Sequence, residues 1–233
     1  MTVSGRLLLI SNSTQHGSGY LDHVAKEIIA LLGSAKRVAF VPHAMHDRDG
    51  YAARARARFE AMGYALHSVH EPGASLDGAD AWFVGGGNTF RLLDAMQRLE
   101  LIAAIRSGVA RGIPYIGSSA GSIVAGPSLR TTKDMPIVQP RSFEALGLVP
   151  FQISPHYLDP DPGSTHMGET QEERILQFHE ENDAPVVGLR EGSMLLVDAG
   201  RIVLRGHAGA RIFRKGRPPV EAEPGGHLEQ LVA

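Results

Sequence analysis

Short apolar segments alternate with amphipathic helical patterns along the first half of the chain, and this alternation constrains the fold more than any other feature. The apolar segments have the pattern of buried strands and are residues 6–10, 38–41, 79–84 and 113–116. Apolar residues at helical spacing lie between or after them in residues 21–32, 51–62, 90–99 and 101–110. Strands that alternate with helices in this way predict a mostly parallel sheet covered by helices on both faces.

The pattern changes after Ala184 to short strands separated by glycine turns. These strands are expected at residues 186–189, 194–197, 202–204 and 211–213, and their pattern predicts an antiparallel edge or flap. The segment from Arg217 onward is rich in Pro, Gly and Glu, and we expect it to be loosely held. No linker or repeat divides the 233 residues, so a single domain over residues 1–233 is expected.

Composition narrows the classes of partner and of chemistry. The net charge of −2 gives no reason to expect nucleic acid or an anionic membrane as a partner. No apolar run approaches the about 20 residues of a membrane span, and residues 1–6 lack the layout of a signal peptide. The chain has no cysteine, which excludes disulfides, thiolate metal sites and a cysteine nucleophile. We therefore expect a cytoplasmic protein whose covalent nucleophile, if it has one, is an oxygen, a lysine or a histidine.

The motif G-x-S-x-G occupies residues 117–121, directly after the apolar segment 113–116 and before helix-like residues 122–125. A serine on such a strand-to-helix turn projects its hydroxyl above the sheet, beside the free N–H groups of the helix. Small residues around it leave room for a strained backbone and for a substrate. The same motif also occurs as an ordinary small-residue loop, so on its own it makes Ser119 a candidate nucleophile.

A second glycine turn, residues 85–88, ends the strand 79–84, and Asn88 is placed to cap the following helix. Ligands bind beyond the carboxyl ends of strands in open α/β sheets, so the two glycine turns are expected to share one crevice. Neither G-x-G-x-x-G nor a G-K-[ST] lysine is present, which favours an oxyanion hole over a phosphate site. Ala120 would supply one N–H and Gly87 or Gly86 the other.

A serine nucleophile needs a base, and His156 has the best context among the eleven histidines. It follows a short strand, residues 152–155, that ends in proline, and it precedes a turn. The paired histidines at 43 and 46 and at 67 and 70 lack an H-E-x-x-H motif and regularly spaced carboxylates. We therefore expect no metal site and no cofactor.

The acid that would orient the imidazole is either Asp134 or Glu191. Only fifteen residues separate Asp134 from Ser119, which leaves no space for the intervening strands of an α/β-hydrolase. Glu191 lies just after the strand 186–189, at another strand end. The residue pattern alone leaves the choice open.

Six segments together resemble one family. They are residues 9–14 (LISNST), 84–90 (VGGGNTF), 117–121 (GSSAG), 131–137 (TTKDMPI), 154–157 (SPHY) and 168–170 (GET). In this order they resemble the peptidase E family of aspartyl dipeptidases, which is grouped with the cyanophycinases, over residues 7 to about 197. The resemblance implies a three-layer α/β sandwich with a mostly parallel sheet like that of class I glutamine amidotransferases. It also implies a cytoplasmic serine peptidase that cleaves dipeptides with an N-terminal aspartate.

By position, the resemblance makes Ser119 the nucleophile and His156 its base. Asp134 and Glu191 match residues that compete for the third role, and we favour Glu191 as the orienting acid. Asp134 would then bind the substrate ammonium, with Asn88 also in the substrate site. The substrate carboxylate needs a cation, for which the candidates are Arg130, Lys133, Arg141 and Arg174. Gln171 stands where the family often has arginine, a departure that bears on how strictly aspartate is selected.

The expected partner is a small peptide, with neither nucleic acid nor membrane, and the expected state is a monomer or weak homodimer. Two other functions fit the same residues. A cyanophycinase-like or other acyl hydrolase of relaxed specificity would keep Ser119 and His156 but accept other substrates. A non-catalytic binding module on an amidotransferase-like scaffold would have no chemical need for that pair.

Overall fold

The computed structural model describes residues 5–163, 165 and 167–231. In this part of the chain a seven-stranded sheet has the order β3-β2-β4-β5-β1-β8-β9. Its strands are β1 Leu7–Ile10, β2 Arg37–Val41, β3 Ala65–Ser68, β4 Ala81–Val84, β5 Tyr115–Ser118, β8 Ser193–Asp198 and β9 Arg201–Gly206. The first five of these run parallel, and β8 and β9 add an antiparallel edge. The mostly parallel sheet expected from the alternating pattern is confirmed.

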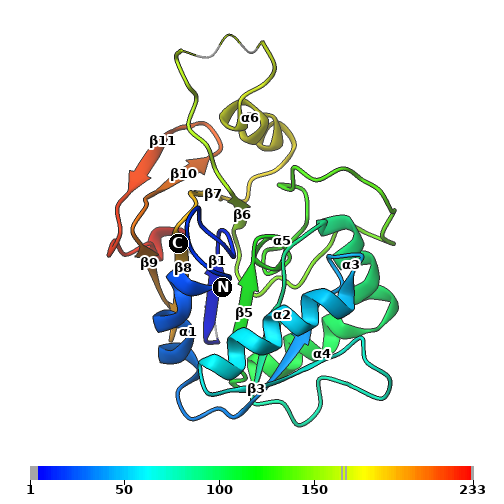
Figure 1. Ribbon diagram of the computed structural model, residues 1–233. Helices are drawn as coiled ribbons and strands as arrows, with labels where there is room; N and C mark the ends of the chain where they lie inside the picture. The colour runs from blue at the N-terminus through cyan, green and yellow to red at the C-terminus, as the bar shows by residue number, and fades with distance from the viewer. Residues whose placement is uncertain (1–4, 164, 166, 232–233) are drawn as a thin grey trace.

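Helices cover both faces of this sheet. The side chains of β1 alternate between two buried clusters, as the two-residue period of a strand requires. Leu8 and Ile10 pack with α1 Ala25–Leu32 and α2 Arg48–Ala61. Leu7 and Leu9 belong to the cluster on the opposite face. Its helices are α3 Thr89–Arg98, α4 Leu101–Ala110 and α5 Ala120–Ile123. The three-layer arrangement follows from this division (Figure 1).

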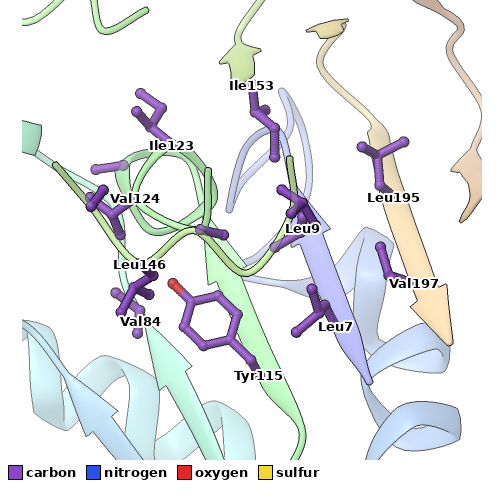
Figure 2. Packing of buried hydrophobic residues seen from close by; sticks show 14 of the residues in the cluster. Leu7, Leu9, Val84, Tyr115, Ile123, Val124, Leu146, Ile153, Leu195 and Val197 are labelled. Carbon is purple, nitrogen blue, oxygen red and sulfur yellow. The ribbon is translucent and has the colours of Figure 1, made fainter. Parts of the chain in front are cut away.

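Tyr115 belongs to the buried cluster that contains Leu7 and Leu9, and it also contacts the segment that follows β5. Its ring lies among the side chains of Leu7, Val84 and Leu146, as Figure 2 shows, and none of its surface is exposed. Its hydroxyl finds a partner inside the core because it donates a hydrogen bond of 2.6 Å to the carbonyl oxygen of Gly121. The start of α5 is therefore tied to the interior of the sheet.

A second sheet has the order β11-β10-β7-β6. Its strands are β6 Gln152–Pro155, β7 Val186–Leu189, β10 Ala210–Arg214 and β11 Arg217–Ala222. β6 and β7 are parallel to each other, whereas β10 and β11 pair antiparallel. Helix α6, Gln171–Glu181, begins at a capping box formed by Thr170 and Glu173 and lies at the top of Figure 1, above β6. No helix in the described part of the chain is long and apolar enough to cross a membrane.

The expectation that the segment from Arg217 is loosely held is wrong. Residues 217–222 form β11, and residues 229–231 form the 3-10 helix η2. Leu228 and Leu231 are each only 2% exposed and belong to the main buried cluster. Two prolines misled the interpretation, but β11 is an edge strand, where proline is tolerated because one row of N–H groups needs no partner.

The two sheets meet where β1 ends. The N–H of Ser11 donates to the carbonyl oxygen of Ser193 at 3.0 Å, and its hydroxyl donates to the carbonyl oxygen of Leu189 at 2.8 Å. The same hydroxyl accepts a hydrogen bond of 2.9 Å from the N–H of His156. A single buried serine thus connects the carboxyl ends of β1, β6 and β7.

Candidate active site

Ser119 lies on a strained turn between β5 and α5. Its φ of +51° is uncommon for a residue with a side chain, and such conformations cost about 1–3 kcal/mol. The backbone is held there because its N–H donates to the carbonyl oxygen of Ile10 at 2.9 Å. Its carbonyl oxygen accepts from Ser122 at 2.8 Å and from Ile123 at 3.0 Å. The turn therefore has the form expected for a G-x-S-x-G nucleophile.

The two glycines of this motif are required by close backbone contacts. A Cβ atom at Gly117 would lie 2.5 Å from the carbonyl oxygen of Gly121, and one at Gly121 would lie 2.1 Å from that of Val84. A Cβ at Gly86 would meet the Cβ of Ser119 at 3.0 Å, so the second glycine turn packs directly against the serine. The two glycine turns therefore lie side by side at the carboxyl ends of the paired strands β4 and β5.

The structure brings Ser119, His156 and Glu191 into one line. The Nε2 atom of His156 is 3.0 Å from the Oγ atom of Ser119, and its Nδ1 atom is 2.6 Å from the Oε1 atom of Glu191. With a proton on Nδ1, the imidazole donates to the carboxylate and accepts from the serine hydroxyl. The side chains of His156 and Glu191 are 42% and 52% exposed, so solvent reaches both of them.

The loop that carries Glu191 is anchored on both sides. The N–H of Gly192 donates to the Oδ1 atom of Asn12 at 2.8 Å, and the Ser11 hydroxyl holds the carbonyl of Leu189. Arg190 forms ion pairs with Asp159 at 2.6 Å and with Glu221 at 2.9 Å. These contacts fix the backbone around a glutamate whose own carboxylate remains accessible.

Asp134 is bound at the start of α3 and makes no hydrogen bond to His156 in the part of the chain that the structure describes. Its Oδ2 atom accepts from the N–H of Thr89 at 2.7 Å, from the Thr89 hydroxyl at 2.6 Å and from the Thr132 hydroxyl at 3.0 Å. Thr89 is the first residue of α3, so the carboxylate faces the positive end of that helix. Asn88 caps the same helix through Arg91 N–H at 3.0 Å, and its amide donates to the Met135 carbonyl oxygen at 2.9 Å.

Two of the three N–H groups considered for an oxyanion hole are open. The N–H of Gly86 donates to the hydroxyl of Tyr51 at 2.9 Å. Those of Gly87 and Ala120 have no partner among the described residues. Gly87 has a φ of +131°, and a Cβ there would lie 2.7 Å from the carbonyl oxygen of Ala44, so only glycine fits.

Three of the four candidate cations share one cavity, and the fourth lies apart from them. Arg130, Lys133 and Arg174 line one small cavity of about 70 Å³ beside α6, and Gln171 lines it too. Arg174 is 3.6 Å from Glu169, and both side chains are 54% exposed. Arg141 instead borders a separate cleft beside α3 and α4.

Lys133 is the most constrained of these cations. Its Nζ atom donates to the carbonyl oxygens of Pro155 at 2.8 Å and His156 at 3.0 Å, and to the Oε1 atom of Gln171 at 3.1 Å. The residue keeps an exposed surface, but loss of water around the ammonium lowers its pKa to about 8. The carboxylates of Asp134 and Glu191 act in the opposite direction and favour the charged form.

Two of the four paired histidines have hydrogen-bond partners of their own. Among the described residues no group of three or more His, Asp or Glu side chains is placed to hold a metal ion. His67 instead contacts the carbonyl oxygen of Ser75 at 2.8 Å, and His70 contacts Asp49 at 3.0 Å.

Four residues hold parts of the site in ways that the sequence interpretation did not assign to them, although it considered Gln171 for substrate selection and placed residues 11 and 12 in a matching segment. The Ser11 hydroxyl accepts from the N–H of His156, and the Asn12 side chain accepts from the N–H of Gly192. The Tyr51 hydroxyl accepts from the N–H of Gly86, and the Gln171 amide donates to the carbonyl oxygen of His156. Ser11 and Asn12 were detectable because polar residues directly after a buried parallel strand face the ligand crevice. Tyr51 gave no such signal, since it occupies an ordinary apolar position of α2.

Comparisons with known proteins point to one family. The family model "Peptidase family S51" matches residues 7–205. "Peptidase E" of Streptomyces coelicolor is 57% identical over 229 residues, which cover 97% of this chain and 94% of that protein. "Probable alpha-aspartyl dipeptidase" of Drosophila melanogaster is 45% identical over 230 residues, with 96% of each chain covered. The crystal structure of a peptidase from an acI-B1 Actinobacterium has a similar fold, with a TM-score of 0.72 at 18% identity and 96% of each chain covered. The chain therefore belongs to peptidase family S51 and is a hydrolase of peptide bonds.

Proposed function

We propose that this chain is a serine-type dipeptidase that hydrolyses dipeptides with an N-terminal aspartate. The observation that carries the proposal is the contact of the Ser119 hydroxyl with the His156 imidazole at 3.0 Å and of that imidazole with Glu191 at 2.6 Å. A hydroxyl, an imidazole and a carboxylate in this order are the groups that acyl transfer through serine requires. The name of the relative at 45% identity, a probable alpha-aspartyl dipeptidase, supports the substrate class, and that of the relative at 57% identity, Peptidase E, supports a peptidase.

In this mechanism His156 takes the proton of Ser119 as the hydroxyl oxygen attacks the scissile carbonyl carbon. Glu191 keeps the other imidazole proton on Nδ1 and stabilises the imidazolium that forms. The N–H groups of Ala120 and Gly87 are the open donors for the oxyanion, and losing one such donor typically costs about 3–4 kcal/mol of barrier. His156 then gives its proton to the leaving amine, and water hydrolyses the aspartyl-enzyme.

Asp134 and Arg174 would recognise the charged groups of the N-terminal aspartate. The Oδ2 atom of Asp134 is fully engaged by Thr89 and Thr132, whereas its Oδ1 atom has no hydrogen bond within the described residues and is free to accept from an ammonium. The ion pair of Arg174 with Glu169 is long and exposed, and such pairs contribute little stability. A substrate carboxylate would therefore replace Glu169 at little cost.

Three further expectations stay predictions. We infer that residues 1–233 act as one peptidase domain, that the protein works in the cytoplasm, and that it is a monomer or weak homodimer. The contacts of His156 with Ser119 and Glu191 are made within one copy of the chain, which supports a site that one protomer completes.

The proposal is tested by turnover of a dipeptide panel that varies only the N-terminal residue, with Asp-Leu as the reference. We expect Asp-Leu to be preferred, and Ser119→Ala or His156→Ala to lower kcat by about 10³-fold or more. Ser107→Ala and His227→Ala are matched controls, because both residues lie on the surface away from the crevice.

The other outcomes separate the alternatives. Equal turnover of several N-terminal residues, or cleavage of a poly-aspartate-arginine polymer, would indicate a hydrolase of relaxed specificity. Undiminished turnover in Ser119→Ala would falsify the assignment of the nucleophile.

A further inference from the structure

The backbone of His156 is held in a conformation that a histidine does not adopt without support. Its φ of +51° lies in the left-handed region, which costs a residue with a side chain roughly 1–2 kcal/mol. This conformation turns the imidazole back from the end of β6 toward Ser119 and Glu191. Strained positions of this kind persist only where the surroundings fix them.

Both polar groups of the His156 backbone are bound by side chains from other parts of the chain. The N–H donates to the Ser11 hydroxyl at 2.9 Å. The carbonyl oxygen accepts two hydrogen bonds, one from the Lys133 ammonium at 3.0 Å and one from the Gln171 amide at 3.2 Å. The preceding carbonyl, that of Pro155, accepts from Lys133 at 2.8 Å.

Lys133 and Gln171 also bind each other. The Oε1 atom of Gln171 accepts from the Lys133 ammonium at 3.1 Å and from the N–H of Leu158 at 3.1 Å. An ammonium has three N–H groups, and here three protein oxygens accept from it. Lys133 therefore has no donor left for a substrate, and the Gln171 amide is committed at both of its ends.

We propose that Lys133 and Gln171 form a clamp that positions His156 for proton transfer, and that neither residue binds the carboxylate of the substrate. This inference rests on the proposed role of His156 as the base. It removes Lys133 from the candidates for the substrate carboxylate. It also gives Gln171 a structural role, because its amide donates to the carbonyl oxygen of His156 and its Oε1 atom accepts from the N–H of Leu158.

The clamp has a consequence for the pH dependence of the reaction. Loss of water around the Lys133 ammonium lowers its pKa to about 8. The charged groups that face it are Asp134 on its own loop, Glu191 after β7 and Arg174 on α6, with the His156 imidazole beyond the shared carbonyl. Above pH 8 the neutral amine keeps only two N–H groups for three acceptors. We therefore expect kcat to fall as the pH rises through about 8.

The experiment compares kcat, KM and the pH profile for Asp-Leu in Lys133→Met, Lys133→Arg and Gln171→Leu. Lys133→Met and Gln171→Leu are expected to lower kcat about 10- to 100-fold, because small misplacements of reacting groups cost this much. KM is expected to stay within about twofold, since a positioning residue does not bind the substrate. Lys133→Arg keeps its charge, so its kcat should not fall near pH 8, even if its value at pH 7 is reduced. Lys26→Met on α1 and Gln230→Leu on η2 are matched controls at exposed positions that contact neither the clamp nor Arg174.

Several results would overturn the clamp. One is an increase in KM with unchanged kcat in Lys133→Met, which would make Lys133 a substrate ligand. Another is wild-type kcat in Gln171→Leu, or a fall near pH 8 that persists in Lys133→Arg. If Lys133→Met does not fold, the other two variants decide the question. Failure of the proposed function is recognised separately, because His156→Ala would then remain active.

Discussion

The choice between Glu191 and Asp134 as the acid of the site leads to a sharp prediction. Glu191→Gln removes the charge 2.6 Å from the Nδ1 atom of His156 and lets an amide N–H compete for the same position. Asp134→Asn removes a charge that contacts Thr89 and Thr132 instead. The two substitutions are equally conservative in shape, so their kinetic effects report on the two roles.

The magnitudes follow from the surroundings of each carboxylate. In a buried triad, exchange of the acid for its amide costs about 10⁴-fold in kcat, because the imidazole takes the wrong tautomer. The Glu191 side chain is 52% exposed, and water screens part of its charge. We therefore expect Glu191→Gln to lower kcat about 10²- to 10³-fold, or about 3–4 kcal/mol of barrier. Asp134→Asn still accepts from Thr89 and loses only the charge at the start of α3, which is worth about 0.3–1 kcal/mol of folding stability.

The assay is steady-state hydrolysis of Asp-Leu, combined with urea unfolding of each variant. Because Asp134 is proposed to bind the substrate ammonium, Asp134→Asn should raise KM more than it lowers kcat. Glu191→Gln should lower kcat without changing the unfolding midpoint. A larger loss of kcat in Asp134→Asn than in Glu191→Gln would refute this assignment.

Three other predictions concern single residues. Tyr51→Phe leaves the Gly86 N–H without its acceptor, so the glycine turn beside the serine should shift and kcat should fall about tenfold at constant KM; an unchanged kcat would show that the hydroxyl does not position the turn. Gly121→Ala places a Cβ 2.1 Å from a carbonyl oxygen of β4 and should destabilise the protein by about 1–3 kcal/mol in urea unfolding, and an unchanged midpoint would contradict this. Burial lowers the pKa of His43 to about 4, so between pH 6.5 and 4 the unfolded chain binds a proton that the folded chain does not. Stability should therefore fall with decreasing pH in this window, by at most about 3 kcal/mol, and His43→Leu should flatten the dependence; equal acid sensitivity in both proteins would count against it.

Much of the fold was predictable because it depends on local patterns. The period of the apolar residues identified four of the five parallel strands, namely β1, β2, β4 and β5, and the helices α1 to α4. Asn88 caps α3 as expected, through its own side chain and the N–H of Arg91. The turn at Ser119 was equally local, since its glycines, its serine and the flanking strand and helix lie within a short stretch.

Other elements escaped the sequence interpretation for physical reasons. β3 has the short, mixed pattern of a parallel edge strand and was not expected. β11 contains two prolines, and it pairs with the preceding strand β10 across the two-residue turn of Lys215 and Gly216, a hairpin signal that the interpretation overlooked. For β3 the hydrogen bonds that define the strand come from β2, which is separated from it along the chain by α2.

The amino-acid sequence by itself determined the alternating α/β architecture, the turn that presents Ser119, and the short set of residues able to serve it as base and acid. Only the tertiary structure decided that Glu191, and not Asp134, lies against the imidazole, and that Gly87, and not Gly86, keeps an open N–H. The physical reason is distance along the chain. Periodicity and turn chemistry act over a few residues, whereas these contacts join residues 35 positions apart, and their geometry is set by how two sheets pack.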